Sequence, residues 1–245
     1  MKTKLVISDL TRMYQKRVCI AGYDRDHRCI RPVLPPPGIP EDALLADGKP
    51  AIFPFALVEF DLTDPNPQPP HTEDVYYDPQ SPRFVREIIS REEILQWSLF
   101  GSVEEIFAQP IHTDLGAYVM DCTGERSLGT ILPGEIIQAI YEPEPSQEEP
   151  WDYRLIFLDA IESKYRLKIV DLTWHYYCDS LRGETRGPKE IAAELTRMLR
   201  SRKVYLRIGL SRGWKEFPDR CYLQITGIFT FPDYLDGKTF ADFKD

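Results

Sequence analysis

Short apolar runs alternate with polar turns along this chain of 245 residues, and the spacing of the apolar residues predicts β-strands. Residues 4–10 are apolar and β-branched, and residues 17–23 alternate between apolar and more polar positions. Residues 28–33 resume the apolar pattern after the polar turn 24–27. Two apolar runs separated by four turn-forming residues predict a β-hairpin over residues 17–33.

Further strands are predicted wherever the period of two returns. Every second residue of 55–62 is apolar, so one face of that strand should be buried. Helical signals are fewer: Ser90 is followed by Glu93 in a capping-box arrangement, and Pro188 begins a run with apolar residues at helical spacing. The last two predicted strands are expected to pair. The strands predicted after the hairpin are 55–62, 135–141, 153–160, 165–172, 204–210 and 222–229, and the predicted helices are 90–99, 103–107 and 188–202.

Proline-rich segments separate these elements. Residues 34–40 and 64–70 hold too many prolines for central strands and are predicted to be surface loops. Residues 142–150 are acidic, proline-rich and without a large apolar residue to bury, which favours a linker. We therefore predict two domains, 1–142 and 151–245, the second with one helix. Many short strands with little helix favour an α+β fold, mainly β, built as two small barrels.

The net charge of −9 is spread unevenly along the chain. Residues 1–125 hold 12 Lys or Arg and 20 Asp or Glu, a net charge of −8, whereas residues 126–245 carry −1. Within the second half, residues 182–215 hold ten basic and three acidic residues, a net charge of +7. An acidic chain is a poor indiscriminate binder of nucleic acid, but a local basic segment suits one specific anionic partner.

The cysteines and the apolar segments predict the compartment. Five cysteines occur without a CxxC pair, so neither a disulfide framework nor a zinc site is expected. The apolar residues after the first lysines are too few for a signal sequence, and no stretch of about 18 apolar residues could span a bilayer. The chain is therefore predicted to be cytoplasmic, with no membrane association.

Sequence motifs for common enzyme chemistries are missing. No phosphate-binding glycine loop, hydrolase elbow or metalloprotease motif occurs, and no catalytic residue, metal ligand or cofactor is assigned. A binding function without catalysis is therefore favoured. One alternative is a metal-dependent phosphoester hydrolase that uses Asp9, Glu59 or Asp61. Another is a protein-interaction module that presents the proline-rich loops 34–40 and 64–70 to a partner.

Arginines next to aromatic residues suggest an anionic ligand. Single-stranded nucleic acid is held on barrel strands by cations that meet phosphates and by rings on which bases stack. The expected partner is therefore single-stranded nucleic acid or a nucleotide. The basic residues with this placement are Arg17, Arg28 and Arg31 around the predicted hairpin and Arg207 and Arg212 around strand 204–210, which Trp214 follows.

The first 35 residues resemble a known family. The run Leu-Val-Ile-Ser-Asp-Leu at 5–10, Arg-Val-Cys-Ile-Ala-Gly at 17–22 and Cys-Ile-Arg-Pro-Val at 29–33 are similar to the opening of the dual OB-containing domain family. The resemblance implies two OB-type barrels and a role in binding nucleic acid or a nucleotide-like ligand, without any catalytic residue. Arg17, Cys19, Gly22 and Arg31 fall on recurring positions of the family. The candidate ligand-binding residues are thus Arg17, Cys19, Arg28, Arg31, Arg207, Arg212 and Trp214.

Overall fold

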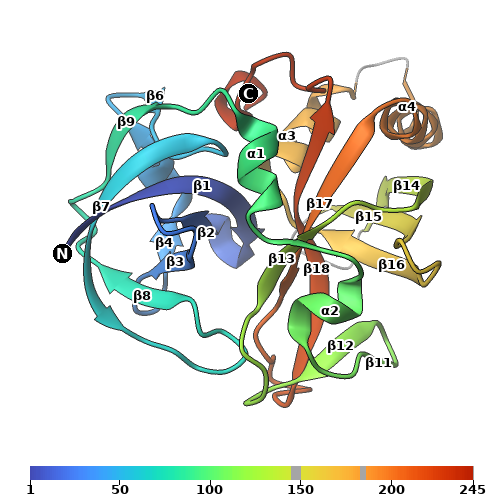
Figure 1. Ribbon diagram of the computed structural model, residues 1–245. Coiled ribbons are helices and arrows are strands. Elements are labelled where there is room, and N and C mark those ends of the chain that lie inside the picture. Colours follow the sequence, from blue (N-terminus) through green and yellow to red (C-terminus); the bar gives the residue numbers. More distant parts are fainter. Residues whose placement is uncertain (145–149, 183–185, 245) are drawn as a thin grey trace.

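The computed structural model describes residues 1–144, 150–182 and 186–244. The fold is mostly β, with 46% of the residues in strands and four short helices. Two β-rich bodies lie side by side, the N-terminal half on the left of Figure 1 and the C-terminal half on the right. No helix in these three ranges is long and apolar enough to cross a membrane.

The N-terminal half contains a closed barrel of five strands. The strand order is β1-β2-β3-β8-β7, and pairing of β7 with β1 closes the barrel. Neighbouring strands are antiparallel except β3 and β8, which run parallel. This Greek-key order is that of the OB fold. The strands are β1 (Lys2–Met13), β2 (Arg17–Tyr23), β3 (Cys29–Val33), β7 (Ala56–Pro65) and β8 (Asp74–Tyr77).

The pattern of apolar residues explains the inside of this first barrel. In β7 the alternate residues Ala56, Val58, Phe60 and Leu62 are all buried, as the sequence predicts. The predicted hairpin is also confirmed, because β2 and β3 pair antiparallel across the turn that follows Tyr23. Burying one large apolar side chain stabilises a fold by about 1.5–3 kcal/mol, so this face of β7 contributes much of the barrel core.

The C-terminal half repeats the same strand order. Its path is β14-β15-β16-β18-β17, with β16 and β18 parallel and the other neighbours antiparallel. The two OB-type barrels predicted from the sequence are therefore present. No pairing between β14 and β17 is recorded for the residues described. The strands are β14 (Glu135–Pro143), β15 (Trp151–Leu158), β16 (Lys164–Ile169), β17 (Lys203–Leu210) and β18 (Arg220–Phe231).

Helix α4 (Pro188–Arg200) packs against the edge of β14 that lacks a strand partner. The Arg200 guanidinium donates hydrogen bonds to the carbonyl oxygens of Ile136 (2.8 Å) and Ile137 (2.7 Å). The Thr196 hydroxyl accepts from the amide of Ala139 at 2.9 Å. Side chains of the helix thus satisfy backbone groups that a neighbouring strand would otherwise bond.

Helix α3 (Leu172–Ser180) corrects the prediction of a single helix in the C-terminal half. The Asp171 carboxylate caps it by accepting hydrogen bonds from the amides of Thr173 (2.9 Å) and Trp174 (3.2 Å). The segment has no clear polar face, because four of its first residues are buried along with Cys178. Because the segment has no amphipathic period, the sequence does not predict this helix, and the predicted strand 165–172 includes its first residue.

The remaining elements are short and connect or extend the two barrels. The helices α1 and α2 match two of the predicted helical segments. The elements are β4 (Ile39–Pro40), η2 (Glu41–Leu44), β5 (Leu45–Ala46), β6 (Lys49–Pro50), β9 (Arg83–Glu87), α1 (Arg91–Gln96), β10 (Leu99–Phe100), α2 (Val103–Phe107), β11 (His112–Thr113), β12 (Ala117–Met120), β13 (Leu128–Ile131), and the single turns η1 (Tyr14–Lys16) and η3 (Phe240–Asp242).

The sheets divide the chain differently from the predicted domains 1–142 and 151–245. Residues 145–149 of the predicted linker lie outside the described residues. On either side of them, Pro143 of β14 pairs with Trp151 of β15, so both strands belong to one sheet. The first sheet ends with β9 and the second begins with β10. The acidic, proline-rich segment therefore connects two neighbouring strands of one sheet. Composition alone does not distinguish such a connection from a linker between domains.

Candidate ligand-binding face

Arg207 of β17 lies in the joint between the barrels, where the outer face of β1 and β2 packs against the outer face of β17 and β18. Its side chain is fully buried and donates to the Asp9 carboxylate of β1 over 2.7–3.1 Å. The Thr226 hydroxyl of β18 donates to the same carboxylate at 2.6 Å. The remaining guanidinium bonds go to Tyr23, Ser98 and Thr130 (2.5–3.0 Å).

This environment makes the predicted ligand-binding role of Arg207 wrong. A guanidinium that is buried and bonded to two barrels has no accessible donor for a ligand. The alternation of β17 correctly places Arg207 on the opposite face from the core residues Leu206 and Ile208. The sequence predicts an open face there, but the first barrel covers it.

Arg31 and Arg212 meet at one buried carboxylate. Arg31 of β3 donates through Nε to Asp74 at 2.5 Å, and its side chain is buried. Arg212, from the loop between β17 and β18, donates to the other oxygen of Asp74 and keeps about half of its side chain (48%) exposed. Next to them Glu73 accepts from the amide (2.7 Å) and the hydroxyl (2.9 Å) of Ser127. These contacts join the barrels, so Arg31 is unavailable to a ligand and only Arg212 reaches solvent.

Cys19 and Arg17 lie on the outer face of β2, near this junction. The Cys19 thiol is half-buried, and its charged neighbours are Arg31, Asp74 and Arg212. Burial raises the pKa of this thiol, which keeps it protonated at neutral pH and unsuited to act as a nucleophile. Arg17, the first residue of β2, is half-buried and pairs in register with Met13.

Arg28 lies apart from these residues, at the turn between β2 and β3. It pairs with the Asp24 carboxylate at 2.8 Å and with Asp26 at 3.5 Å, while most of its side chain is exposed. The ring of His27 stacks on Trp97 of the segment after α1, with centroids 4.0 Å apart. The structure thus brings Cys19, Arg31 and Arg212 together but leaves Arg28 elsewhere, where it stabilises a turn.

The outer face of β15 and β16 is cationic, with Lys164 and Arg166 exposed and Arg154 and Lys168 half-buried. Arg154 of β15 faces Lys168 of β16 in register, and Ile156 faces Arg166. Lys168 in turn faces Gln224 of β18. The alternate residues on these strands are buried in the core: Tyr153, Leu155 and Phe157 in β15, and Leu167 and Ile169 in β16. We call the set Arg154, Ile156, Lys164, Arg166, Lys168 and Gln224 the outer face of the second barrel.

Sequence reasoning missed these residues, although the signal was present. The six residues of β16 read Lys-Tyr-Arg-Leu-Lys-Ile, with a cation at every second position. That alternation predicts a strand, and the stronger charge signal lies in the basic segment 182–215. Part of that segment, residues 183–185, lies outside the described residues. Its two arginines at the barrel joint, Arg207 and Arg212, are engaged by carboxylates.

Trp214 is the predicted residue that does border the outer face. It lies in the loop between β17 and β18, and 51% of its side chain is exposed. Its ring contacts Phe217 (centroids 5.9 Å apart) and Tyr222 of β18 (6.4 Å). In the OB fold the loop between the fourth and fifth strands flanks the face of the second and third strands, and this loop has that position.

The carboxylates considered for a hydrolase are engaged by cations. Asp9 pairs with Arg207, Glu59 lies 3.7 Å from the Lys2 ammonium, and Asp61 binds the N-terminal amine at 2.7 Å. Across the three described ranges no group of three His, Cys, Asp or Glu side chains could hold a metal ion. The loop 64–70, considered for partner binding, contacts the second barrel instead, since the Cys122 amide donates to the Pro69 carbonyl at 3.0 Å.

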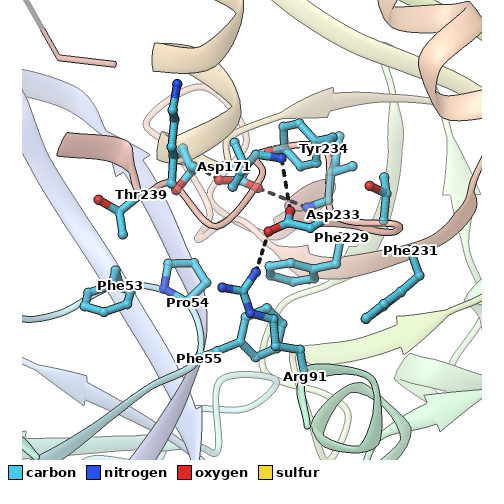
Figure 2. Close-up of a pocket in the computed structure, with 15 residues that line it drawn as sticks. Phe53, Pro54, Phe55, Arg91, Asp171, Phe229, Phe231, Asp233, Tyr234 and Thr239 are labelled. Carbon is cyan, nitrogen blue, oxygen red and sulfur yellow. Dashed lines mark hydrogen bonds and ion pairs between the residues drawn. The ribbon is translucent and has the colours of Figure 1, made fainter. Parts of the chain in front are cut away.

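An apolar cavity lies at the far side of the barrel joint (Figure 2). Phe53 and Phe55 of the first barrel face Phe229 and Phe231 of β18, and Arg91 reaches Asp233 at 2.6 Å across it. The cavity has a volume of about 40 Å³, which admits a few water molecules rather than a ligand of many atoms. Its aromatic walls serve the contact between the barrels.

Comparison with known proteins agrees with this strand order. The family model of the dual OB-containing domain matches residues 3–228, which run from the second residue of β1 to Ile228, three residues before the end of β18. No curated protein matches the chain. Two copies of the OB strand order and a family match over most of the sequence show that the chain belongs to the dual OB-containing domain family.

Proposed function

We propose that this protein binds nucleic acid through the outer face of the second barrel. The observation that carries the proposal is an asymmetry between the barrels. OB folds bind oligonucleotides on the face of their second and third strands. In the first barrel that face, on β2 and β3, lies against the second barrel. In the second barrel the equivalent face, on β15 and β16, is open and carries cations.

The spacing of these cations suits a chain of phosphates. Residues two apart on a strand are about 6.6–6.8 Å apart, which separates Lys164, Arg166 and Lys168 along β16. Arg154 stands across from Lys168 on the neighbouring strand, at about 5 Å between backbones. Its Nε donates to Asp152 at 2.6 Å, which orients the guanidinium on the face. The Asp152 carboxylate neutralises Arg154, so the charge offered to consecutive phosphates comes from Lys164, Arg166 and Lys168 of β16.

The charge of the rest of the chain restricts where a polyanion can bind. Residues 1–125, which include the whole first barrel, carry a net charge of −8. A polyanion is repelled by that half and attracted to the outer face, so binding should be local and strongly dependent on salt. Both predicted partners, single-stranded nucleic acid and a nucleotide, carry the phosphate that this face recognises.

Fluorescence anisotropy with a labelled 12-nucleotide oligo(dT) at several salt concentrations tests the proposal. Each phosphate contact should contribute about −0.7 to the slope of log K against log salt for a single strand. Arg166→Ala should weaken binding and reduce the steepness of that slope by about 0.7. The matched control is Arg86→Ala, which removes the same charge from an exposed position of β9 in the first barrel. Salt-dependent binding that both variants weaken equally, or no salt-dependent binding at all, contradicts the proposal.

A further inference from the structure

Aromatic side chains form a continuous row next to the outer face. Tyr118 of β12 stacks on His112 of β11 with centroids 5.3 Å apart and lies 5.6 Å from Tyr222 of β18. Tyr222 contacts Trp214, which contacts Phe217. The row therefore combines the hairpin of β11 and β12 with the loop between β17 and β18. We call His112, Tyr118, Tyr222, Trp214 and Phe217 the aromatic row.

The aromatic row is not needed to bury the β11–β12 hairpin. In β12 the residue that enters the core is Val119, which is fully buried. Tyr118 and Met120 point to the opposite side, toward solvent. His112 is exposed and Trp214 is half exposed. Tyr118, Tyr222 and Phe217 are half-buried beside them. A contiguous apolar surface left partly in water marks an interaction site, which isolated exposed residues do not.

Arg220 holds two of these rings, Tyr118 and Phe217, in place. Its guanidinium carbon lies 4.8 Å from the centre of the Tyr118 ring and 4.4 Å from that of Phe217. The Asp114 carboxylate accepts from the same guanidinium at 2.7 Å. Cation–π contacts of this kind fix the rings relative to one another, so the row is ordered before any ligand binds.

The aromatic row continues the outer face. Tyr222 and Gln224 are two residues apart on β18 and point to the same side, and Gln224 faces Lys168 of β16. Phosphates on the cations of β15 and β16 would therefore bring the adjoining bases over the rings. The hairpin of β11 and β12 is not one of the five barrel strands, because it pairs with the edge of β18.

We infer that the aromatic row stacks unpaired bases, so that the ligand is a single strand rather than a duplex or a free nucleotide. The inference rests on the proposed binding of nucleic acid at the outer face. A duplex keeps its base faces stacked inside and offers none to the rings. A free nucleotide is too short to use the cations and the rings together. Only a single strand of several residues engages both.

The test compares three probes of equal length: oligo(dT), the same strand with abasic residues, and a duplex. Stacking contributes about 1–3 kcal/mol per base, so oligo(dT) should bind about 5- to 150-fold more tightly than the abasic strand. Trp214→Ala and Tyr118→Ala should each lower the affinity for oligo(dT) by a similar factor. Neither should change the affinity for the abasic strand or the salt dependence.

Phe84→Ala is the matched control, because Phe84 of β9 is exposed to a similar extent (46%) on the first barrel. It should leave all three affinities unchanged. Equal affinities of the wild-type protein for oligo(dT) and the abasic strand would overturn the inference and leave the proposed function standing. So would a loss in Trp214→Ala that is the same for both strands. If none of the probes binds with salt dependence, the proposed function itself fails.

Discussion

Loss of the Arg207 side chain should destabilise the protein strongly without acting on the proposed binding face. Arg207→Met keeps the apolar stem and removes the guanidinium. Asp9 then stays buried with only hydroxyl partners, since Ser8 (2.6 Å) and Thr226 (2.6 Å) still donate to its carboxylate. The hydroxyls of Tyr23 and Thr130 also lose a donor.

The loss of unfolding free energy in Arg207→Met follows from leaving the buried Asp9 carboxylate without a cation. Removing one partner of a buried ion pair costs about 3–5 kcal/mol, because the remaining charge is left without compensation. The whole unfolding free energy of a domain is about 5–15 kcal/mol. Arg207→Met should therefore remove about a fifth or more of the unfolding free energy. The double variant Asp9→Leu with Arg207→Met should recover most of it, because buried ion pairs replaced by apolar residues are often neutral.

Urea unfolding followed by tryptophan fluorescence and by circular dichroism measures these differences. The matched control Arg86→Met, at an exposed position of β9, should change the unfolding free energy by less than about 0.5 kcal/mol. If Arg207→Met costs no more than Arg86→Met, Arg207 is not a structural link between the barrels. If the double variant is no more stable than the single one, an unpaired Asp9 is not the cause of the loss.

Three further outcomes follow from buried groups elsewhere in the chain. Burial lowers the pKa of His71 to about 3, so His71 stays neutral in the folded protein. The unfolded chain, in contrast, gains a proton on this histidine below about pH 6.5. As the pH is lowered from 6 to 4, the unfolding free energy of the wild-type protein relative to that of His71→Gln should therefore fall by about 1.4 kcal/mol per pH unit, measured in urea titrations. A difference that stays constant with pH would contradict a buried neutral histidine. Gly22→Ala would place a Cβ 2.5 Å from the Val6 carbonyl oxygen of β1. This overpacking should lower the unfolding free energy by about 1–3 kcal/mol in the same assay. An unchanged urea midpoint would exclude this close approach. In thiol titration with a disulfide reagent, the exposed Cys122 should react before the buried Cys178, which should react only on unfolding; the opposite order would contradict the burial described.

Much of the first barrel is predictable because its strands are amphipathic. The face of β7 that contains Val58 and Phe60 is wholly apolar, and the hairpin of β2 and β3 has a turn of polar residues between two apolar runs. Periodicity of this kind reports which face is buried within one barrel. It does not report what covers the other face, and Arg31 and Arg207 were therefore placed at a ligand surface.

The candidate site depended on how the two barrels pack, which local patterns do not encode. Arg207 and Asp9 are 198 positions apart in the chain, yet they form the most buried ion pair of the joint. The first barrel covers the outer face of β17 and β18, whereas Arg166 of β16 lies on a face that it leaves exposed. The alternation in β16 was visible in the sequence, but nothing local distinguished its charged face from any solvated surface.

We propose that nucleic acid binds to the open face of the second barrel and not to the corresponding face of the first. Backbone amide chemical shifts of the isotope-labelled protein, measured by NMR during titration with 12-nucleotide oligo(dT), test it most directly. The largest changes should fall on β15, β16 and the loop around Trp214, with saturation at one strand per chain. Changes concentrated on β2 and β3, or two strands bound per chain, would contradict it.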